Sequence, residues 1–177
     1  MPALKTLAEP SDLFDAIRET LLERLRGVTV DDYAGFEHDT VVDALVLIEF
    51  EQSAPATRGN DGRYCHEFTL MVHGVVGRQR QRAGLAAINL ASAIERIVDL
   101  NCWGIDPDQI DVPEAIHSEP SIFKAGAQGF EAWGCNFRQR IYLGASGYPE
   151  DPVIGGLPFV DVGATGDFER WDAPGAG

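Results

Sequence analysis

Residues 131–143, EAWGCNFRQRIYL, form the most regular alternating pattern in this chain. Successive side chains of a β-strand point to opposite faces, so such alternation indicates a strand covered mainly on one face. The apolar residues share one face of the predicted strand: Trp133, Cys135, Phe137, Ile141 and Leu143. The polar residues on the other face include Asn136, Arg138 and Arg140.

Two earlier stretches are predicted to pair as a β-hairpin. Residues 44–51 begin with an apolar run and end in alternation, which is typical of a strand whose end reaches the surface. Residues 64–76 alternate throughout, and one face of this strand would carry Tyr64, Phe68, Leu70 and Val72. Residues 52–63 between them are polar and rich in turn-forming residues, so they are expected to form a long loop.

Two stretches have apolar residues at helical spacing. Residues 12–26 are predicted to form a helix that Ser11 caps and Gly27 ends. Its apolar face would carry Leu13, Ile17, Leu21 and Leu25. A second helix is predicted over residues 82–101, and its apolar residues are Leu85, Ile88, Ala91, Ile94, Ile97 and Val98.

The remaining segments lack a persistent period. Residues 28–43 are acidic and expected to be irregular, and residues 105–119 are expected to form a polar surface connection. Residues 123–130 fit either a short strand or a turn. In residues 145–177, 11 of the 33 residues are glycine or proline, which indicates an arm or tail after a domain of residues 1–144. We call this segment the C-terminal arm; its apolar residues, which include Phe159 and Trp171, suggest that it docks on its own domain or on a neighbour.

The charge balance excludes some classes of function. The chain has 177 residues, with 28 acidic and 14 basic residues and a formal net charge of −14. Affinity for nucleic acid comes largely from cationic contacts with phosphates, so a surface that grips DNA over its whole face is disfavoured. Adhesion to anionic lipid by charge is disfavoured for the same reason. No apolar run approaches the roughly 18 residues of a membrane span. The three cysteines, Cys65, Cys102 and Cys135, are few and odd in number, which favours a soluble protein in a reducing compartment without a disulfide framework.

Signatures of catalysis are absent from the sequence. It contains no Cys-x-x-Cys, His-Glu-x-x-His, phosphate-binding loop or Gly-x-Ser-x-Gly motif. The best enzyme hypothesis is a metal-dependent nuclease or hydrolase in which Asp43, Glu49 and Glu51, with His66, hold Mg²⁺. The favoured interpretation is that Glu49 and Glu51 line the exposed end of a strand, because no lysine follows at a useful spacing.

Five arginines stand out from the acidic background: Arg78, Arg80, Arg82, Arg138 and Arg140. The first three precede the second predicted helix, where each cation opposes the helix dipole by roughly 0.3–1 kcal/mol when it lies in the first turn. One interpretation is that the arginines pair with nearby acids on the surface. The other is that they form one docking patch for an acidic partner, including a second copy of this chain.

The order of these elements resembles that of the tail terminator, or tail completion, proteins of long-tailed bacteriophages. The likeness rests on a pattern of elements and aromatic positions within residues 11–144: residues 13–25, 45–50, 68–76, 85–103 and 133–143. The resemblance implies an α+β fold, with a small, mostly antiparallel sheet and two helices packed on one face. The long C-terminal arm departs from the family pattern.

The resemblance also implies a structural function, with no reaction, cofactor or metal. Such proteins form a homo-oligomeric ring, commonly of six subunits, that caps the tail tube and joins it to the neck or connector of the virion. The arginines and the C-terminal arm, with Phe159 and Trp171, would then contact a neighbouring subunit or the tail tube protein. Genomic DNA would pass an acidic channel without specific binding. A head–tail connector or neck protein is the alternative assembly function.

Overall fold

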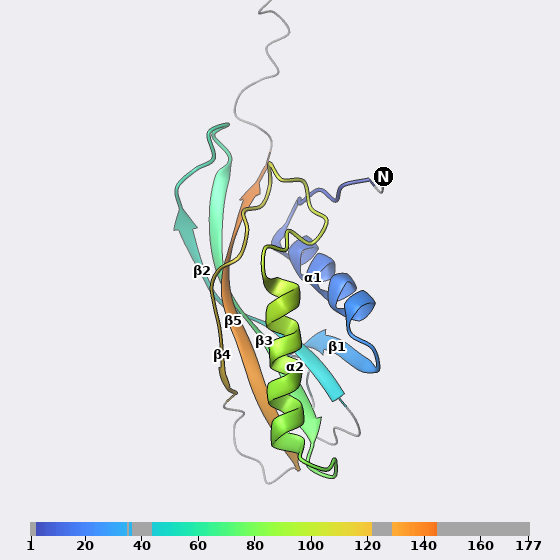
Figure 1. The fold of residues 1–177 in the computed structure, drawn as a ribbon. Helices are drawn as coiled ribbons and strands as arrows, with labels where there is room; N and C mark the ends of the chain where they lie inside the picture. Colours follow the sequence, from blue (N-terminus) through green and yellow to red (C-terminus); the bar gives the residue numbers. More distant parts are fainter. Residues whose placement is uncertain (1–2, 35, 37–43, 122–128, 145–177) are drawn as a thin grey trace, which may run out of the picture.

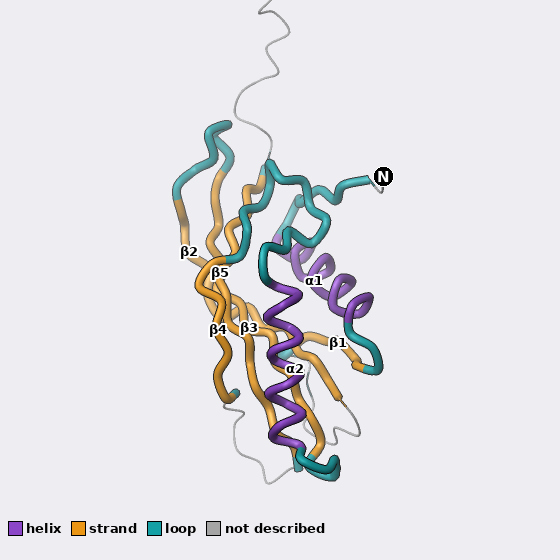
Figure 2. Tube along the Cα trace, viewed as in Figure 1, coloured by secondary structure: helices purple, strands orange, loops and turns teal. Residues whose placement is uncertain are grey.

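The computed structural model describes residues 3–34, 36, 44–121 and 129–144 (Figure 1). Within these ranges the chain forms two helices and five strands (Figure 2). Their order is α1 (Pro10–Arg24), β1 (Val28–Asp32), β2 (Ala44–Ala56), β3 (Tyr64–Gly77), α2 (Ala83–Val98), β4 (Glu114–Pro120) and β5 (Phe130–Leu143). The C-terminal arm, residues 122–128 and Asp43 lie outside the described residues.

The strands form one sheet in the order β1-β2-β3-β5-β4, and both helices pack on one face of it (Figure 1). Only the β1–β2 pair is parallel within the described sheet. The helices and the sheet share one apolar core, in which Ile17 of α1 and Ile94 of α2 lie with Ile48, Leu70 and Phe137. The α+β architecture implied by the resemblance is therefore confirmed.

The central strands are those that the sequence predicts most clearly. β5 pairs with β3 over its whole length, from Leu143 opposite Tyr64 to Phe130 opposite Gly77. Its predicted core side chains Cys135, Phe137 and Ile141 are buried against the helices. The predicted β2–β3 hairpin is also confirmed, but β2 continues to Ala56, so only residues 57–63 remain as the loop. The extension was missed because its polar residues face water and it is held by pairing with β3 rather than by burial.

Two strands occur where irregular structure was expected. β1 lies within residues 28–43, and β4 lies within the stretch predicted to be a surface connection. Both are short and largely exposed, and they stand at the two edges of the sheet. Edge strands depend on hydrogen bonds to one neighbour, so their sequences need little apolar alternation. The predictions of irregular structure were therefore wrong for these two segments.

The helix bounds also differ in detail from the prediction. α1 begins at Pro10 rather than at residue 12, and Ser11 is not its cap. Asp12 instead accepts hydrogen bonds from the backbone N–H groups of Ala8 and Glu9, at 2.7 and 3.0 Å, and these bonds lower the pKa of its carboxyl. α2 ends at Val98, three residues before the expected end. No helix in the described ranges is long and apolar enough to cross a membrane.

Candidate functional site

The five arginines singled out in the sequence lie in two places, not in one patch. Arg140 stands opposite Glu67 in the β3–β5 ladder, whereas Arg78 follows Gly77 at the far end of β3. The ten residues from Glu67 to Gly77 span roughly 33 Å of extended strand. The expectation of a single docking patch is therefore corrected: long central strands hold the two groups apart.

Arg138 and Arg140 lie on the sheet face away from the helices and pair with acids of neighbouring strands. Glu67 of β3 binds both: its Oε2 is 2.8 Å from Arg140 Nε, and its Oε1 is 3.4 Å from Arg138 Nη1. Glu114 of β4 lies 3.6 Å from Arg140 and 3.8 Å from Arg138. The hydrogen bond to Glu67 raises the pKa of Arg140. For these two arginines, pairing with nearby acids is the interpretation that the structure supports.

Replacing Arg140 with alanine is expected to lower the free energy of unfolding by about 1 kcal/mol or less, because exposed ion pairs contribute little. Both partners remain in contact with water, with 36% of the Arg140 side chain and 19% of the Glu67 side chain exposed. Chemical denaturation of the variant at low and high salt measures the effect. A loss of several kcal/mol would show that this pair is not the surface interaction described here.

The other three arginines occupy the turn between β3 and α2, at what we call the basic end of the sheet. Arg78 Nε lies 2.9 Å from Glu131 Oε1. Arg82 immediately precedes α2, which has no acidic residue in its first turn. Arg80 lines a pocket of about 490 Å³ together with Arg26, which follows α1. Sequence reasoning missed Arg26, because only the parallel pairing of β1 with β2 brings it beside the turn. The other lining residues include Val76 of β3 and Ala86, Asn89 and Leu90 of α2.

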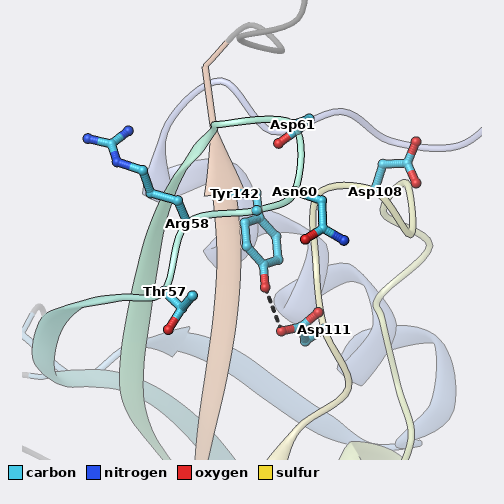
Figure 3. A pocket seen from close by; sticks show the side chains of 8 residues that line it. Thr57, Arg58, Asn60, Asp61, Asp108, Asp111 and Tyr142 are labelled. Carbon is cyan, nitrogen blue, oxygen red and sulfur yellow. Dashed lines mark hydrogen bonds between the residues drawn. The ribbon is translucent and has the colours of Figure 1, made fainter. Parts of the chain in front are cut away.

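The opposite end of the sheet carries mainly acidic side chains, and we call it the acidic end. The loop after β2 and residues 105–111 together line an open pocket of about 410 Å³ (Figure 3). Asp61, Asp108 and Asp111 line it, while the guanidinium of Arg58 points away from them (Figure 3). The pocket is lined further by Thr57, Gly59, Asn60 and Tyr142.

Hydrogen bonds and ion pairs fix two of these carboxylates. Tyr142 Oη donates a hydrogen bond of 2.8 Å to Asp111 Oδ2 (Figure 3). Burial, followed by this bond to Asp111, raises the pKa of the Tyr142 hydroxyl, which therefore stays protonated at neutral pH. Asp61 Oδ2 lies 2.7 Å from Arg63 Nε. The acidic pocket is thus partly neutralised, and its carboxylates serve the local structure.

A buried histidine joins three strands on the sheet face away from the helices. His73 of β3 is 4% exposed, and its Nε2 lies 2.9 Å from Glu49 Oε2 of β2. Its Nδ1 lies 2.9 Å from Ser121 Oγ, just beyond β4. Tyr33 stacks on the imidazole with ring centroids 4.9 Å apart. Burial lowers the pKa of His73, which favours the neutral ring: Nε2–H then donates to Glu49 and Nδ1 accepts from Ser121. No sequence pattern indicates this network, because Glu49 and Ser121 lie 24 and 48 positions from His73 along the chain.

Glu49 and Glu51 of the metal hypothesis lie near each other, and burial, followed by the charge of Glu49, raises the pKa of Glu51. The structure does not bring His66 to them. Glu49 binds His73, whereas His66 stacks on Phe68, whose ring belongs to the core under the helices, and meets Tyr64 edge-on. Residues 66 and 73 have opposite parity in an unbroken ladder, so Glu49 and His66 lie on opposite faces of the sheet. Asp43 lies outside the described residues. Across the described part of the chain, no three His, Cys, Asp or Glu residues form a group that could hold a metal ion.

The cysteines are free thiols, in agreement with the expected lack of disulfides. Burial raises the pKa of all three, and that of Cys135 reaches about 12. A thiol of this kind stays protonated at neutral pH and is a poor nucleophile. Phe159 and Trp171, the remaining predicted interface residues, lie outside the described residues.

Comparison of this chain with models of known protein families and with curated proteins gives no match.

Proposed function

We propose that this chain is a structural assembly protein of the tail terminator type, whose copies form a ring that ends a phage tail tube and joins the tail to the neck. The proposal is supported by the agreement between the implied and the observed architecture. Both helices lie on one face of a five-stranded, mostly antiparallel sheet, and the predicted helices and strands follow the expected order, with β1 and β4 in addition. Within this proposal the protein acts by binding other proteins.

The observation that carries the proposal is the separation of charge between the two ends of the sheet. Arg26, Arg78, Arg80 and Arg82 gather at one end, and Asp61, Asp106, Asp108 and Asp111 gather at the other, where they outnumber Arg58 and Arg63. Subunits of a ring make head-to-tail contacts, in which one surface of each copy meets a different surface of the next. Opposite charge on two separate surfaces favours this arrangement and disfavours contacts between like ends.

The charge separation also limits which arginines serve the contact. Arg138 and Arg140 already bind Glu67 and Glu114 within the subunit, and Arg78 binds Glu131, so Arg82 is the strongest candidate for contact with a neighbour. The net charge of −14 opposes close association of copies. Contacts that place arginines against carboxylates reduce this repulsion, and salt screens them over about 8–10 Å.

The test is the mass of the full-length chain in solution, alone and with the tail tube protein from the same genome. Mass photometry or analytical ultracentrifugation is expected to find a closed oligomer that weakens as salt is raised. Arg82→Glu is expected to reduce assembly at least tenfold. A carboxylate near the N-terminus of α2 is favourable for the helix dipole, so this loss would not reflect unfolding.

Arg96→Glu provides the matched control, because it makes the same charge change on the exposed surface near the other end of α2. It is expected to leave assembly unchanged. A chain that stays monomeric at high concentration and does not bind the tube protein would refute the proposal. Binding to the connector in place of the tube would favour the neck protein instead.

A further inference from the structure

The first two turns of α2 expose apolar side chains beside the basic end. Leu85 is 56% exposed and Ile88 is 38% exposed. Positions three apart in a helix are neighbours on its surface, so these two side chains form one apolar strip. Asn89 lies one turn after Leu85 and lines the pocket that holds Arg26 and Arg80. The strip and the pocket therefore adjoin.

We call the strip, the pocket and Arg82 together the α2 basic surface. An isolated exposed leucine is ordinary on a protein surface. Here two large apolar side chains stand within one helical turn of each other, beside a pocket of about 490 Å³ whose lining includes Arg26 and Arg80. In the described part of the chain, Arg82 itself forms no ion pair. A surface with this composition fits a segment that carries both carboxylates and apolar side chains.

We propose that the α2 basic surface binds the C-terminal arm of a second copy of this chain. The arm has six acidic residues and one basic residue, so its formal charge is −5. Its acids alternate with large apolar residues, most densely in GDFERWD, residues 166–172, where Phe168 and Trp171 stand among three carboxylates and one arginine. Arginine pairs well with carboxylates, and the leucine–isoleucine strip offers apolar contact to aromatic rings.

The strand register explains why the arm would come from a second copy. The arm begins after Leu143, which pairs with Tyr64, whereas the arginines follow Gly77. These two ends of β3 are roughly 43 Å apart, at about 3.3 Å per residue. Phe159 lies 15 residues beyond Gly144 and can reach at most about 50 Å. Residues 166–172 alone are far enough along the arm to reach this surface within one chain. Binding through Phe159 as well would force residues 145–159 to run almost straight back past the carboxylates of the acidic end.

Head-to-tail contact with a neighbour avoids this extended return of the arm along its own chain. If the acidic end of one copy faces the basic end of the next, the arm begins close to the surface that receives it. Binding of the arm and the charge attraction between the two ends would then hold the same two copies together. This inference deepens the proposed function and rests on it in one respect: it requires a second copy at the basic end.

The direct experiment titrates a fluorescent peptide of residues 145–177 into full-length protein and follows its anisotropy. The protein carries Phe159→Ser and Trp171→Ser, so that its own arm competes poorly for the surface. Saturable binding is expected, and it should weaken as salt is raised. Adding Arg82→Glu and Leu85→Ser is expected to weaken binding at least tenfold.

The matched control for that pair is Arg96→Glu with Leu100→Ser, because Leu100 is 72% exposed near the other end of α2. This control is expected to bind the peptide as tightly as the parent protein. Circular dichroism and thermal melting check that each variant is folded. Absence of binding, or binding that the Arg82 and Leu85 substitutions leave unchanged in a folded protein, would overturn the proposal.

A mixing experiment distinguishes a second copy from the chain's own arm. One full-length variant carries the surface substitutions Arg82→Glu and Leu85→Ser, and the other carries the arm substitutions Phe159→Ser and Trp171→Ser. Each alone is expected to be monomeric, whereas an equal mixture should form dimers through one intact surface and one intact arm. If the peptide binds but the mixture stays monomeric, the arm binds its own domain and the second-copy assignment is wrong.

The same measurements separate this inference from the proposed function. Peptide binding and dimers in the mixture, together with failure of the native chain to bind tube or connector protein, would leave the arm contact intact and refute the tail terminator proposal. Ring formation that persists after the arm substitutions Phe159→Ser and Trp171→Ser would support the ring and refute the arm contact.

Discussion

Replacing Trp103 with alanine is expected to lower the free energy of unfolding by about 3–5 kcal/mol, the range for truncating a large buried aromatic residue. Trp103 is 2% exposed and lies against Phe137 of β5, with ring centroids 6.2 Å apart. Its indole N–H donates a hydrogen bond of 3.1 Å to Gln139 Oε1, and the Gln139 side chain is fully buried. The substitution therefore leaves both a cavity and an unpaired buried amide oxygen.

Trp103→Phe separates these two contributions. It keeps most of the ring volume but removes the N–H donor, so a smaller loss of about 1–3 kcal/mol is expected for the unpaired Gln139 oxygen. Urea denaturation measured by circular dichroism gives both values. The exposed neighbour Leu100 provides the control, because Leu100→Ser is expected to change stability by less than about 0.5 kcal/mol. A cost below 1 kcal/mol for Trp103→Ala would contradict this account of the core.

The effect of Trp103 should extend to the acidic end. Gln139 Nε2 donates a hydrogen bond to the carbonyl oxygen of Asp111, so Trp103, Gln139 and Asp111 form one chain from the core to the pocket. Asp111 also accepts the hydrogen bond from Tyr142. Hydrogen exchange of the amides in residues 105–111 is expected to accelerate in Trp103→Ala more than in the hairpin strands.

The second large effect concerns His73, whose replacement by phenylalanine is expected to lower stability by about 1–3 kcal/mol at pH 7. Phenylalanine keeps a ring for Tyr33 to stack on, but it leaves Glu49 and Ser121 without their bonds to the imidazole. The network joins β2, β3 and the end of β4, so its loss acts on three strands at once.

The pKa of His73 predicts how the difference in stability between the native protein and His73→Phe changes with pH. Burial lowers the pKa of His73 in the folded state, so above the ordinary histidine pKa of about 6.5 its neutral form contributes fully to stability. As the pH falls below that value, the unfolded chain takes up the proton first and this contribution is lost. The described groups that contact the ring include Glu49, Tyr33 and Ser121, of which Glu49 favours protonation and thus opposes the effect of burial.

The stability advantage of the native protein over His73→Phe is therefore expected to shrink between pH 7 and pH 5. Denaturation curves at several pH values measure it, and taking the difference removes the contribution of other carboxyls. His117→Phe is the control, because this histidine is exposed and its Nδ1 lies near the backbone carbonyl of Ala115 rather than a buried carboxylate. A difference that stays constant or grows toward pH 5 would show that the folded protein favours the charged ring.

The elements predicted from sequence are those that bury a regular apolar face. α1, α2, β3 and β5 each repeat apolar residues at the period of their own backbone, and that repeat is readable without knowing any neighbour. β1 and β4 were missed because each lies at an edge and is held by hydrogen bonds to a partner far along the chain, such as Val28 with Ala44. Such pairing leaves little periodicity in the sequence.

The surface was harder to predict than the core. The sequence shows which arginines stand out from the acidic background. The distance between their two groups depends on how β3 and β5 pair over fourteen residues. Arg26 joins Arg80 only through the fold, since 53 positions separate them in the chain. His73 likewise acquires its role only when three strands place Glu49 and Ser121 on either side of one ring. Distances between segments decide these features, and no local pattern encodes them.

The position of β5 in the sheet has a mechanical consequence. The chain beyond Gly144 is attached directly to this strand, which lies between β3 and β4 rather than at an edge. Tension on the C-terminal arm would therefore pull β5 lengthwise, against hydrogen bonds that lie across the direction of force. The bonds to β3 would bear the load together in shear instead of opening one at a time like a zipper. A subunit tethered through this arm would resist pulling far better than one tethered through an edge strand.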